Sequence, residues 1–153
     1  MGQVVEILIA TTPGESPVPQ ESVRAIPGRG LVGDRYYEVL GTFSPQPHKP
    51  DYEVTLIQQE HIDAFSASFG LAFTARDARR NLVTRGVDLN ALVGKDFRVG
   101  SVLIRGIRLC EPCNHLAKQT WPEVLPGLVH KGGLRAQILS EGDIKVGDAL
   151  ESD

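Results

Sequence analysis

Glycine and proline interrupt this sequence so often that its apolar runs are all short. The 153 residues include 16 glycines and 10 prolines, spread along the whole chain. Such punctuation is typical of many short strands joined by turns. A chain of this length suits one compact domain, residues 1–153, and can bury a core without disulfides or a metal. We therefore predict a mainly β fold, a closed and mostly antiparallel β-barrel with a few short helices.

The predicted elements follow from local apolar patterns and turn signals. The helical features are the spacing of Ile62, Phe65 and Phe69 before a Gly70 C-cap, a capping box in "TARD" (74–77), a short turn after Asp88, and one turn after Thr120 with Pro122 near its first position. In residues 95–109 an alternating apolar strand is followed by Val-Gly, and residues 142–151 repeat this pattern. The repeat predicts that 142–151 form a second, similar hairpin edge. A proline-rich exposed loop is expected at 41–50. Strands are expected at 4–10, 22–26, 53–57, 81–84 and, around a turn at Gly100, twice within 95–109.

Charge and composition exclude several classes of partner. The net charge is −3 and the pI about 5.8, so no global basic field favours nucleic acid or an anionic membrane. The N-terminus "MGQVVEILIATTPG" lacks the basic start and long apolar run of a signal peptide. No apolar segment approaches the roughly 20 residues that span a bilayer. We expect a cytoplasmic protein whose thiols are kept reduced.

Both cysteines lie in one stretch, "RLCEPCNHL", as Cys110 and Cys113, with His115 two residues later. The spacing alone leaves four hypotheses open. A zinc site would use Cys110, Cys113, His115 and His130, although the usual second pair of ligands is missing. A redox dithiol would need a thioredoxin-like βαβ pattern that the chain lacks. Two inert buried cysteines would be the ordinary expectation for this residue type.

The fourth hypothesis is a nucleophilic or metal-ligating thiolate. Nearby cations favour the thiolate, the reactive form of cysteine. "RDARRN" supplies Arg76, Arg79 and Arg80, and "HKGGLR" supplies His130, Lys131 and Arg135. If the barrel brings these segments together, they form an anion pocket that contains a thiol. Each segment is equally compatible with an ordinary exposed helix face or turn.

Four stretches together resemble MOSC domain proteins, whose domain also occurs at the C-terminus of molybdenum cofactor sulfurases. The resemblance runs from about residue 5 to residue 150, and its most specific part is "RRNLVTRGVD", then "LVGKDFRVG", then "CEPC". The stretches, in the family's order, are "GRGLVGDRYY", "VTLIQQE", "ARRNLVTRGVDLNALVGKDFRVGSVLIRGIRLCEPCNHL" and "HKGGLRAQILSEGDIKVGD".

The resemblance implies a β-barrel and places the family's essential cysteine at Cys113, whereas Cys110 matches only some members. It implies a sulfur carrier: the thiolate accepts sulfane sulfur as a persulfide from a cysteine desulfurase and delivers it to a molybdenum cofactor, a molybdoenzyme or another metal–sulfur acceptor. Pyridoxal phosphate would enter only through that partner. It also implies binding of the molybdenum cofactor, with Cys113 as a molybdenum ligand in amidoxime-reducing relatives.

We therefore expect Cys113 to be the working thiol and Cys110 a resolving thiol or a bystander. The pterin of the cofactor carries a phosphate or nucleotide, which cationic side chains and glycine backbone would hold. The alternatives are a molybdenum-dependent reductase of N-hydroxylated compounds and a non-enzymatic zinc or thiol module. The expected cofactor-binding residues are Arg79, Arg80, Asn81, Arg85, His115, His130, Lys131, Gly132, Gly133 and Arg135.

Overall fold

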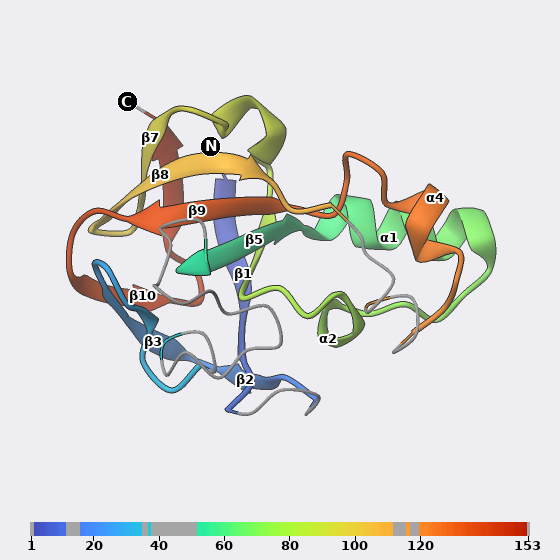
Figure 1. Ribbon diagram of the computed structural model, residues 1–153, viewed down its shortest axis with the longest axis horizontal. Coiled ribbons are helices and arrows are strands. Elements are labelled where there is room, and N and C mark those ends of the chain that lie inside the picture. Colours follow the sequence, from blue (N-terminus) through green and yellow to red (C-terminus); the bar gives the residue numbers. More distant parts are fainter. Residues whose placement is uncertain are drawn as a thin grey trace.

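The computed structural model describes residues 2–11, 16–34, 37, 52–111, 116 and 120–152. Its centre is one large sheet with the strand order β11-β7-β8-β9-β5-β6-β1-β2. A further pairing of β11 with β1 closes the first seven of these strands into a barrel, which confirms the predicted fold class (Figure 1). The strands are β1 (Gly2–Ile9), β2 (Val18–Gln20), β5 (Val54–Gln58), β6 (Leu82–Arg85), β7 (Asp96–Val99), β8 (Val102–Leu109), β9 (Leu134–Ile138) and β11 (Ala149–Ser152).

Most strand pairs in the barrel are antiparallel, and β5 and β6 form the parallel pair. A separate sheet of β10 (Gly142–Lys145), β3 (Ser22–Ile26) and β4 (Gly30–Leu31) lies beside the barrel. The prediction of a second hairpin edge at 142–151 is wrong, because β10 pairs with β3 while β11 pairs with β7 and β1. Alternating apolar residues specify a buried face, but they do not specify which strand lies alongside.

The helices are short, and most begin and end where the sequence predicts. α1 (Gln59–Phe69) ends at Gly70, whose φ of 64° is the left-handed conformation expected of a glycine C-cap. α2 (Ala75–Ala78) begins with the predicted capping box of Thr74 and Asp77. The 3₁₀ turn η2 (Leu89–Leu92) follows Asp88.

The predicted start of the last helix is wrong. α4 (Val124–Gly127) begins after Glu123, not after Thr120. The Thr120 hydroxyl donates backward to the Leu116 carbonyl at 2.7 Å, so it does not cap a following turn. The predicted loop at 41–50 lies outside the described residues.

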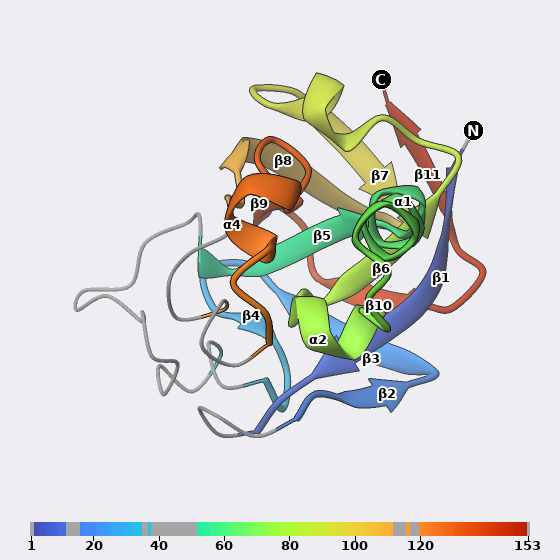
Figure 2. The same ribbon diagram turned by 90° about the vertical axis from the view of Figure 1, so that its right-hand side faces the viewer.

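The buried side chains form two clusters on opposite faces of the barrel wall. Val4, Leu56, Leu82, Phe97 and Ile104 belong to the cluster that fills the barrel interior. The second cluster lies between the outer face of the wall and the helices, which cover this side of the barrel (Figure 2). Its members are Leu8, Ile57, Ile62, Phe65, Phe73, Ala75, Ala78, Val83, Leu116, Val124 and Leu128. Because both faces of β1, β5 and β6 are covered, these strands are fixed firmly in register.

This register brings three distant segments to one end of the barrel. Leu109 at the end of β8 pairs with Leu134 at the start of β9, and Leu134 pairs with Leu56 of β5. Leu56 pairs in turn with Leu82 at the start of β6. The segments just after β8, just before β9 and just before β6 are therefore neighbours.

Candidate functional site

The stretch "CEPCNH" (110–115), called the cysteine segment below, begins where β8 ends. Cys110 is buried, with 2% of its surface exposed, and its backbone N–H donates to the Gly133 carbonyl at 2.7 Å. That bond extends the β8–β9 pairing by one residue past the assigned strands. Cys113 and His115, the predicted working thiol and its neighbour, lie outside the described residues.

Arg80 ties this segment to the other two with hydrogen bonds to backbone carbonyls. Its Nε donates to the Gly132 carbonyl at 2.8 Å and its Nη2 to the Cys110 carbonyl at 3.3 Å. Its Nη1 donates to the Ala78 carbonyl at 3.2 Å. None of the carboxylates in the described part of the chain forms an ion pair with this guanidinium. Within the described residues, a half-buried positive charge is therefore held against the first residue of the cysteine segment by backbone carbonyls.

Arg79, the residue before Arg80, has an uncommon backbone conformation that ends α2. Arg79 is the C-cap of α2 and has a φ of 58°, a left-handed conformation that is uncommon for a residue with a side chain. The chain leaves α2 there and enters β6 three residues later, at Leu82. The two adjacent arginines of "RDARRN" thus have different roles. Arg79 is the C-cap of α2, and Arg80 donates to the cysteine segment.

The turn before β9 contacts the cysteine segment through Glu111. The His130 backbone N–H donates to Glu111 Oε1 at 2.7 Å, and His130 Nδ1 lies 2.8 Å from Glu111 Oε2. The Asn90 side-chain amide donates to the His130 carbonyl at 2.7 Å. His130 was predicted to bind the cofactor, and the structure places it in a contact with a carboxylate of the cysteine segment.

Gly133 lies between the Leu56 carbonyl of β5 and the backbone of Cys110. Gly133 has a φ of 114°, and a Cβ on it would lie 2.1 Å from the Leu56 carbonyl oxygen. Only glycine lets the backbone approach this closely in that conformation. Gly132 contributes its carbonyl to Arg80. Both predicted glycines therefore lie at the site, where their own carbonyls accept hydrogen bonds from Cys110 and Arg80.

Asn81 belongs to a buried network of hydrogen bonds within the protein. Its Oδ1 accepts from the Thr55 backbone N–H and from the Thr55 hydroxyl, each at 3.1 Å. Its Nδ2 donates to the Leu8 carbonyl at 3.1 Å and to Asp34 Oδ1 at 3.4 Å. Asp34 also accepts from the Ala10 backbone N–H at 3.1 Å. The side chain predicted to bind a ligand thus joins two strands, β1 and β5, and the loop that carries Asp34.

The remaining predicted cations are separated by the barrel. Arg85 is at the far end of β6, opposite Gln3 of β1, where its Nη2 is 3.5 Å from the Asp63 carboxylate of α1. Lys131 is exposed beside Gly132. The Arg135 guanidinium carbon lies 4.7 Å from the centre of the Tyr52 ring. The structure therefore brings Arg80 to the cysteine segment, leaves Lys131 exposed in the turn before β9 and Arg135 on the adjacent strand, and does not bring Arg85.

Sequence reasoning missed two residues of this cluster, Glu111 and Asn90. Glu111 had a signal, since it lies between the two cysteines. Asn90 had none, because its contact with His130 joins residues 40 positions apart.

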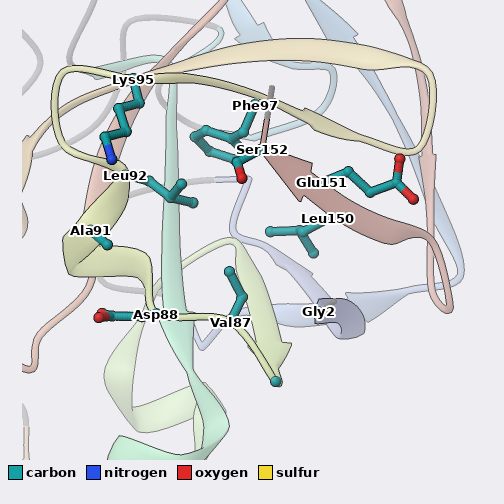
Figure 3. A pocket seen from close by; sticks show the side chains of 11 residues that line it. Gly2, Val87, Asp88, Ala91, Leu92, Lys95, Phe97, Leu150, Glu151 and Ser152 are labelled. Carbon is teal, nitrogen blue, oxygen red and sulfur yellow. The ribbon is translucent and has the colours of Figure 1, made fainter.

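A pocket of about 390 Å³ lies elsewhere, where the chain begins and ends (Figure 3). Val87, Leu92, Phe97 and Leu150 form its apolar walls, and Lys95 and Glu151 are among the other residues that line it. None of the predicted site residues in the described part of the chain lines this pocket. The pocket is therefore separate from the cluster of residues around Cys110.

The zinc hypothesis stays a prediction, since two of its four ligands, Cys113 and His115, are not described. In residues 2–11, 16–34, 37, 52–111, 116 and 120–152, no group of three or more His, Cys, Asp or Glu side chains could hold a metal ion. Among the helices of these same residues, none is long and apolar enough to cross a membrane.

The same fold occurs in several solved structures. The YuaD protein of Bacillus subtilis has a TM-score of 0.84 at 14% identity, with 99% of this chain and 96% of that one covered. YiiM of Geobacillus stearothermophilus has a TM-score of 0.76 at 18% identity, covering 100% and 75%. YiiM of Escherichia coli has a TM-score of 0.71 at 20% identity, covering 100% and 70%. At these identities the likeness is one of fold.

Sequence comparison identifies the family. No curated protein sequence matches the chain. The sequence model described as "MOSC domain" matches residues 46–151, which include β5 to β10, most of β11 and every predicted site residue. The chain belongs to the MOSC domain family.

Proposed function

We propose that this protein is a sulfur carrier that acts in molybdenum cofactor chemistry, with Cys113 as the thiol that accepts sulfur. The observation that carries the proposal is the position of Arg80. The Arg80 guanidinium donates to the carbonyl of Cys110, three residues before Cys113. Within the described residues its hydrogen-bond partners are neutral carbonyls. A nearby cation favours the thiolate, which is the reactive form of cysteine.

The proposed reaction is a thiol exchange. The Cys113 thiolate attacks the outer sulfur of a persulfide on a cysteine desulfurase, and the S–S bond of the donor breaks. A new S–S bond forms on Cys113, and the donor cysteine leaves as a thiolate. Electrons balance without an external oxidant or reductant. Pyridoxal phosphate belongs to the donor enzyme in this scheme, and the reduced cytoplasm is the compartment in which the thiol would remain available.

Cys110 is proposed as the resolving thiol. Its burial shields it from an external donor, which supports assigning acceptance to Cys113. The Cys110 thiolate would attack the inner sulfur of the Cys113 persulfide, release hydrosulfide and leave a Cys110–Cys113 disulfide. A cellular thiol reductant would then restore both cysteines.

The residues at the site also fit an anionic cofactor. When bound, the molybdenum cofactor would supply a metal centre that accepts a soft thiolate such as Cys113. Arg80 and Lys131 would hold its phosphate, with Arg79 and Arg135 as further candidates. The backbone at Gly132 and Gly133 would allow close approach. Arg85 is not part of this proposal, because its partner is Asp63.

The experiment is persulfide loading. The protein is incubated with a cysteine desulfurase and L-cysteine, and its peptides are analysed by mass spectrometry for one added sulfur atom. We expect the sulfur on the Cys113 peptide, no loading in Cys113→Ser, and normal loading with slower sulfide release in Cys110→Ser. Loading that survives in Cys113→Ser but not in Cys110→Ser would reverse the two assignments.

The second candidate is a molybdenum-dependent reductase of N-hydroxylated compounds. This reductase needs a phosphorylated cofactor, and the cations near the cysteine segment suit a phosphate group. They therefore favour this candidate. It predicts stoichiometric molybdenum in protein purified from a host that makes the cofactor. Stoichiometric zinc, together with loss of folding on chelation, would instead support the zinc or thiol module.

A further inference from the structure

The pocket where the chain begins and ends has walls that hydrogen bonds hold apart (Figure 3). On one side is the segment that carries η2. Its Gly86 N–H donates to Glu60 Oε2 at 2.8 Å, and its Leu89 N–H donates to Gln58 Oε1 at 3.0 Å. On the other side is β11, which pairs with both β7 and β1. The pocket is therefore preformed, because neither wall can move toward the other without breaking these bonds.

The inner surface of the pocket is apolar. Leu92, Phe97 and Leu150 line it, and they belong to the core cluster of the barrel interior. Protein interiors leave few voids larger than one water molecule. This pocket has a volume of about 390 Å³, which is the share of roughly thirteen waters at about 30 Å³ each. An apolar ligand of about ten non-hydrogen atoms fits this space and would displace water that apolar walls cannot hydrogen-bond.

Lys95 supplies a positive charge beside this apolar surface. Its backbone is fixed, since its N–H donates to the Leu92 carbonyl at 3.1 Å and its carbonyl accepts from the Gly106 N–H at 2.9 Å. Figure 3 shows its side chain extending toward Ala91 and Leu92. None of the carboxylates in the part of the chain that the structure describes forms an ion pair with Lys95.

The other polar side chains of the pocket differ in direction. Asp88 and Glu151 also line it, but Figure 3 shows both carboxylates pointing away from the apolar walls. The Ser152 hydroxyl points toward those walls and can donate a hydrogen bond. A ligand would therefore meet one ammonium group and one hydroxyl next to the apolar surface. This combination complements a carboxylate.

We propose that this pocket binds a small monocarboxylate with an apolar tail, of about the size of octanoate. The tail lies against Leu92, Phe97 and Leu150, and the carboxylate accepts from Lys95 and Ser152. The pocket is separate from the cluster around Cys110, so this binding does not depend on the sulfur chemistry proposed above.

The test is titration of the full chain with octanoate, followed in the ¹⁵N–¹H NMR spectrum. We expect the amide signals of Val87, Ala91 and Leu150 to shift, with a dissociation constant of about 0.1–1 mM, as suits a ligand of about ten non-hydrogen atoms. Octylamine has a tail of the same length and the opposite charge. It should bind about five-fold more weakly or less, because Lys95 repels it.

Two variants separate the tail from the head group. Ser152→Trp places a large ring where the hydroxyl points, so binding should be lost. Glu151→Trp is its matched control, because neighbouring residues of a strand point to opposite faces. Lys95→Gln should weaken octanoate about five-fold and leave the affinity for neutral 1-octanol unchanged. Lys145→Gln, at an exposed lysine of β10, should bind octanoate like the parent protein.

Three results would each overturn the proposal. They are the absence of shifts at the pocket amides up to about 10 mM octanoate, equal affinities for octanoate and octylamine, and undiminished binding in Ser152→Trp. The competing occupant is a second copy of the chain. Sedimentation as a dimer, with pocket amides that shift with protein concentration and not with octanoate, would assign the pocket to that interface and contradict the proposal.

Discussion

Replacing Gly133 with alanine should destabilise the protein much more than an ordinary glycine substitution in a turn. Gly133 has a φ of 114°, where residues with side chains are strained, and its Cβ would lie 2.1 Å from the Leu56 carbonyl oxygen. That oxygen belongs to the backbone of β5, in the stretch paired with β9. It cannot move away without disturbing the pairing of these strands.

The backbone strain and the steric clash contribute separately to the loss of stability. An unfavourable backbone conformation costs about 1–3 kcal/mol. Forcing extra atoms into a packed site typically costs a further 1–3 kcal/mol or so. Gly133→Ala should therefore lower the free energy of unfolding by about 2–6 kcal/mol, a large part of the roughly 5–15 kcal/mol of a typical domain.

Gly147→Ala separates the two effects. Gly147 has a similar φ of 96°, but nothing lies within 4 Å of the position a Cβ would take. It should show the conformational cost alone. Urea denaturation followed by circular dichroism measures both variants, and with a slope of about 1.5 kcal/mol per molar the Gly133 variant should unfold about 1–2 M earlier than the Gly147 variant.

Equal urea midpoints for the two variants would refute the reasoning, because they would mean that the backbone near Leu56 gives way at no cost. The Gly133 variant has a further expected effect. Because Cys110 donates its N–H to the Gly133 carbonyl, hydrogen exchange at the Cys110 amide should also accelerate.

Three further substitutions test other parts of the structure. Asn81→Ala removes the partner of the Thr55 amide and of the Leu8 carbonyl, both in a buried network, and should cost about 3 kcal/mol in urea denaturation. Arg85→Ala removes one exposed ion pair and should change stability by less than about 1 kcal/mol, with no change in persulfide loading. The hydrogen bond from Arg105 holds the pKa of Asp96 below its ordinary value. The stability from this pair is thus complete above the ordinary aspartate pKa and lost as the pH falls through the lowered one, so Asp96→Asn should flatten the dependence of the urea midpoint on pH in that acidic range.

Local signals in the sequence predict much of the fold. The Gly70 C-cap and the Thr74–Asp77 capping box depend on residues a few positions apart, and both occur as predicted. The strand partners of 142–151 could not be predicted in this way. β10 and β11 have similar patterns but join different sheets, because each partner is decided by the packing of the whole barrel.

The site was predictable in its residue types and less so in its contacts. The cations of "RDARRN" and "HKGGLR" suggested an anion pocket, and Arg80 does reach both Cys110 and Gly132. These contacts span 30 and 52 positions and use backbone carbonyls, which every residue has, so no residue type marks them in advance. Arg85 illustrates the opposite case. It is only five positions after Arg80, yet the length of β6 carries it to the other end of the strand.

The central claim is that Arg80 holds a positive charge where it favours the Cys113 thiolate. Its most direct test is the ultraviolet absorbance of the thiolate against pH, measured on the single-thiol Cys110→Ser protein with Arg80 intact, with Arg80→Lys and with Arg80→Gln. We predict half-ionisation at a lower pH than for an ordinary cysteine, a partial upward shift in the lysine variant and a larger one in the glutamine variant. An ordinary midpoint that is the same in all three proteins would contradict the account.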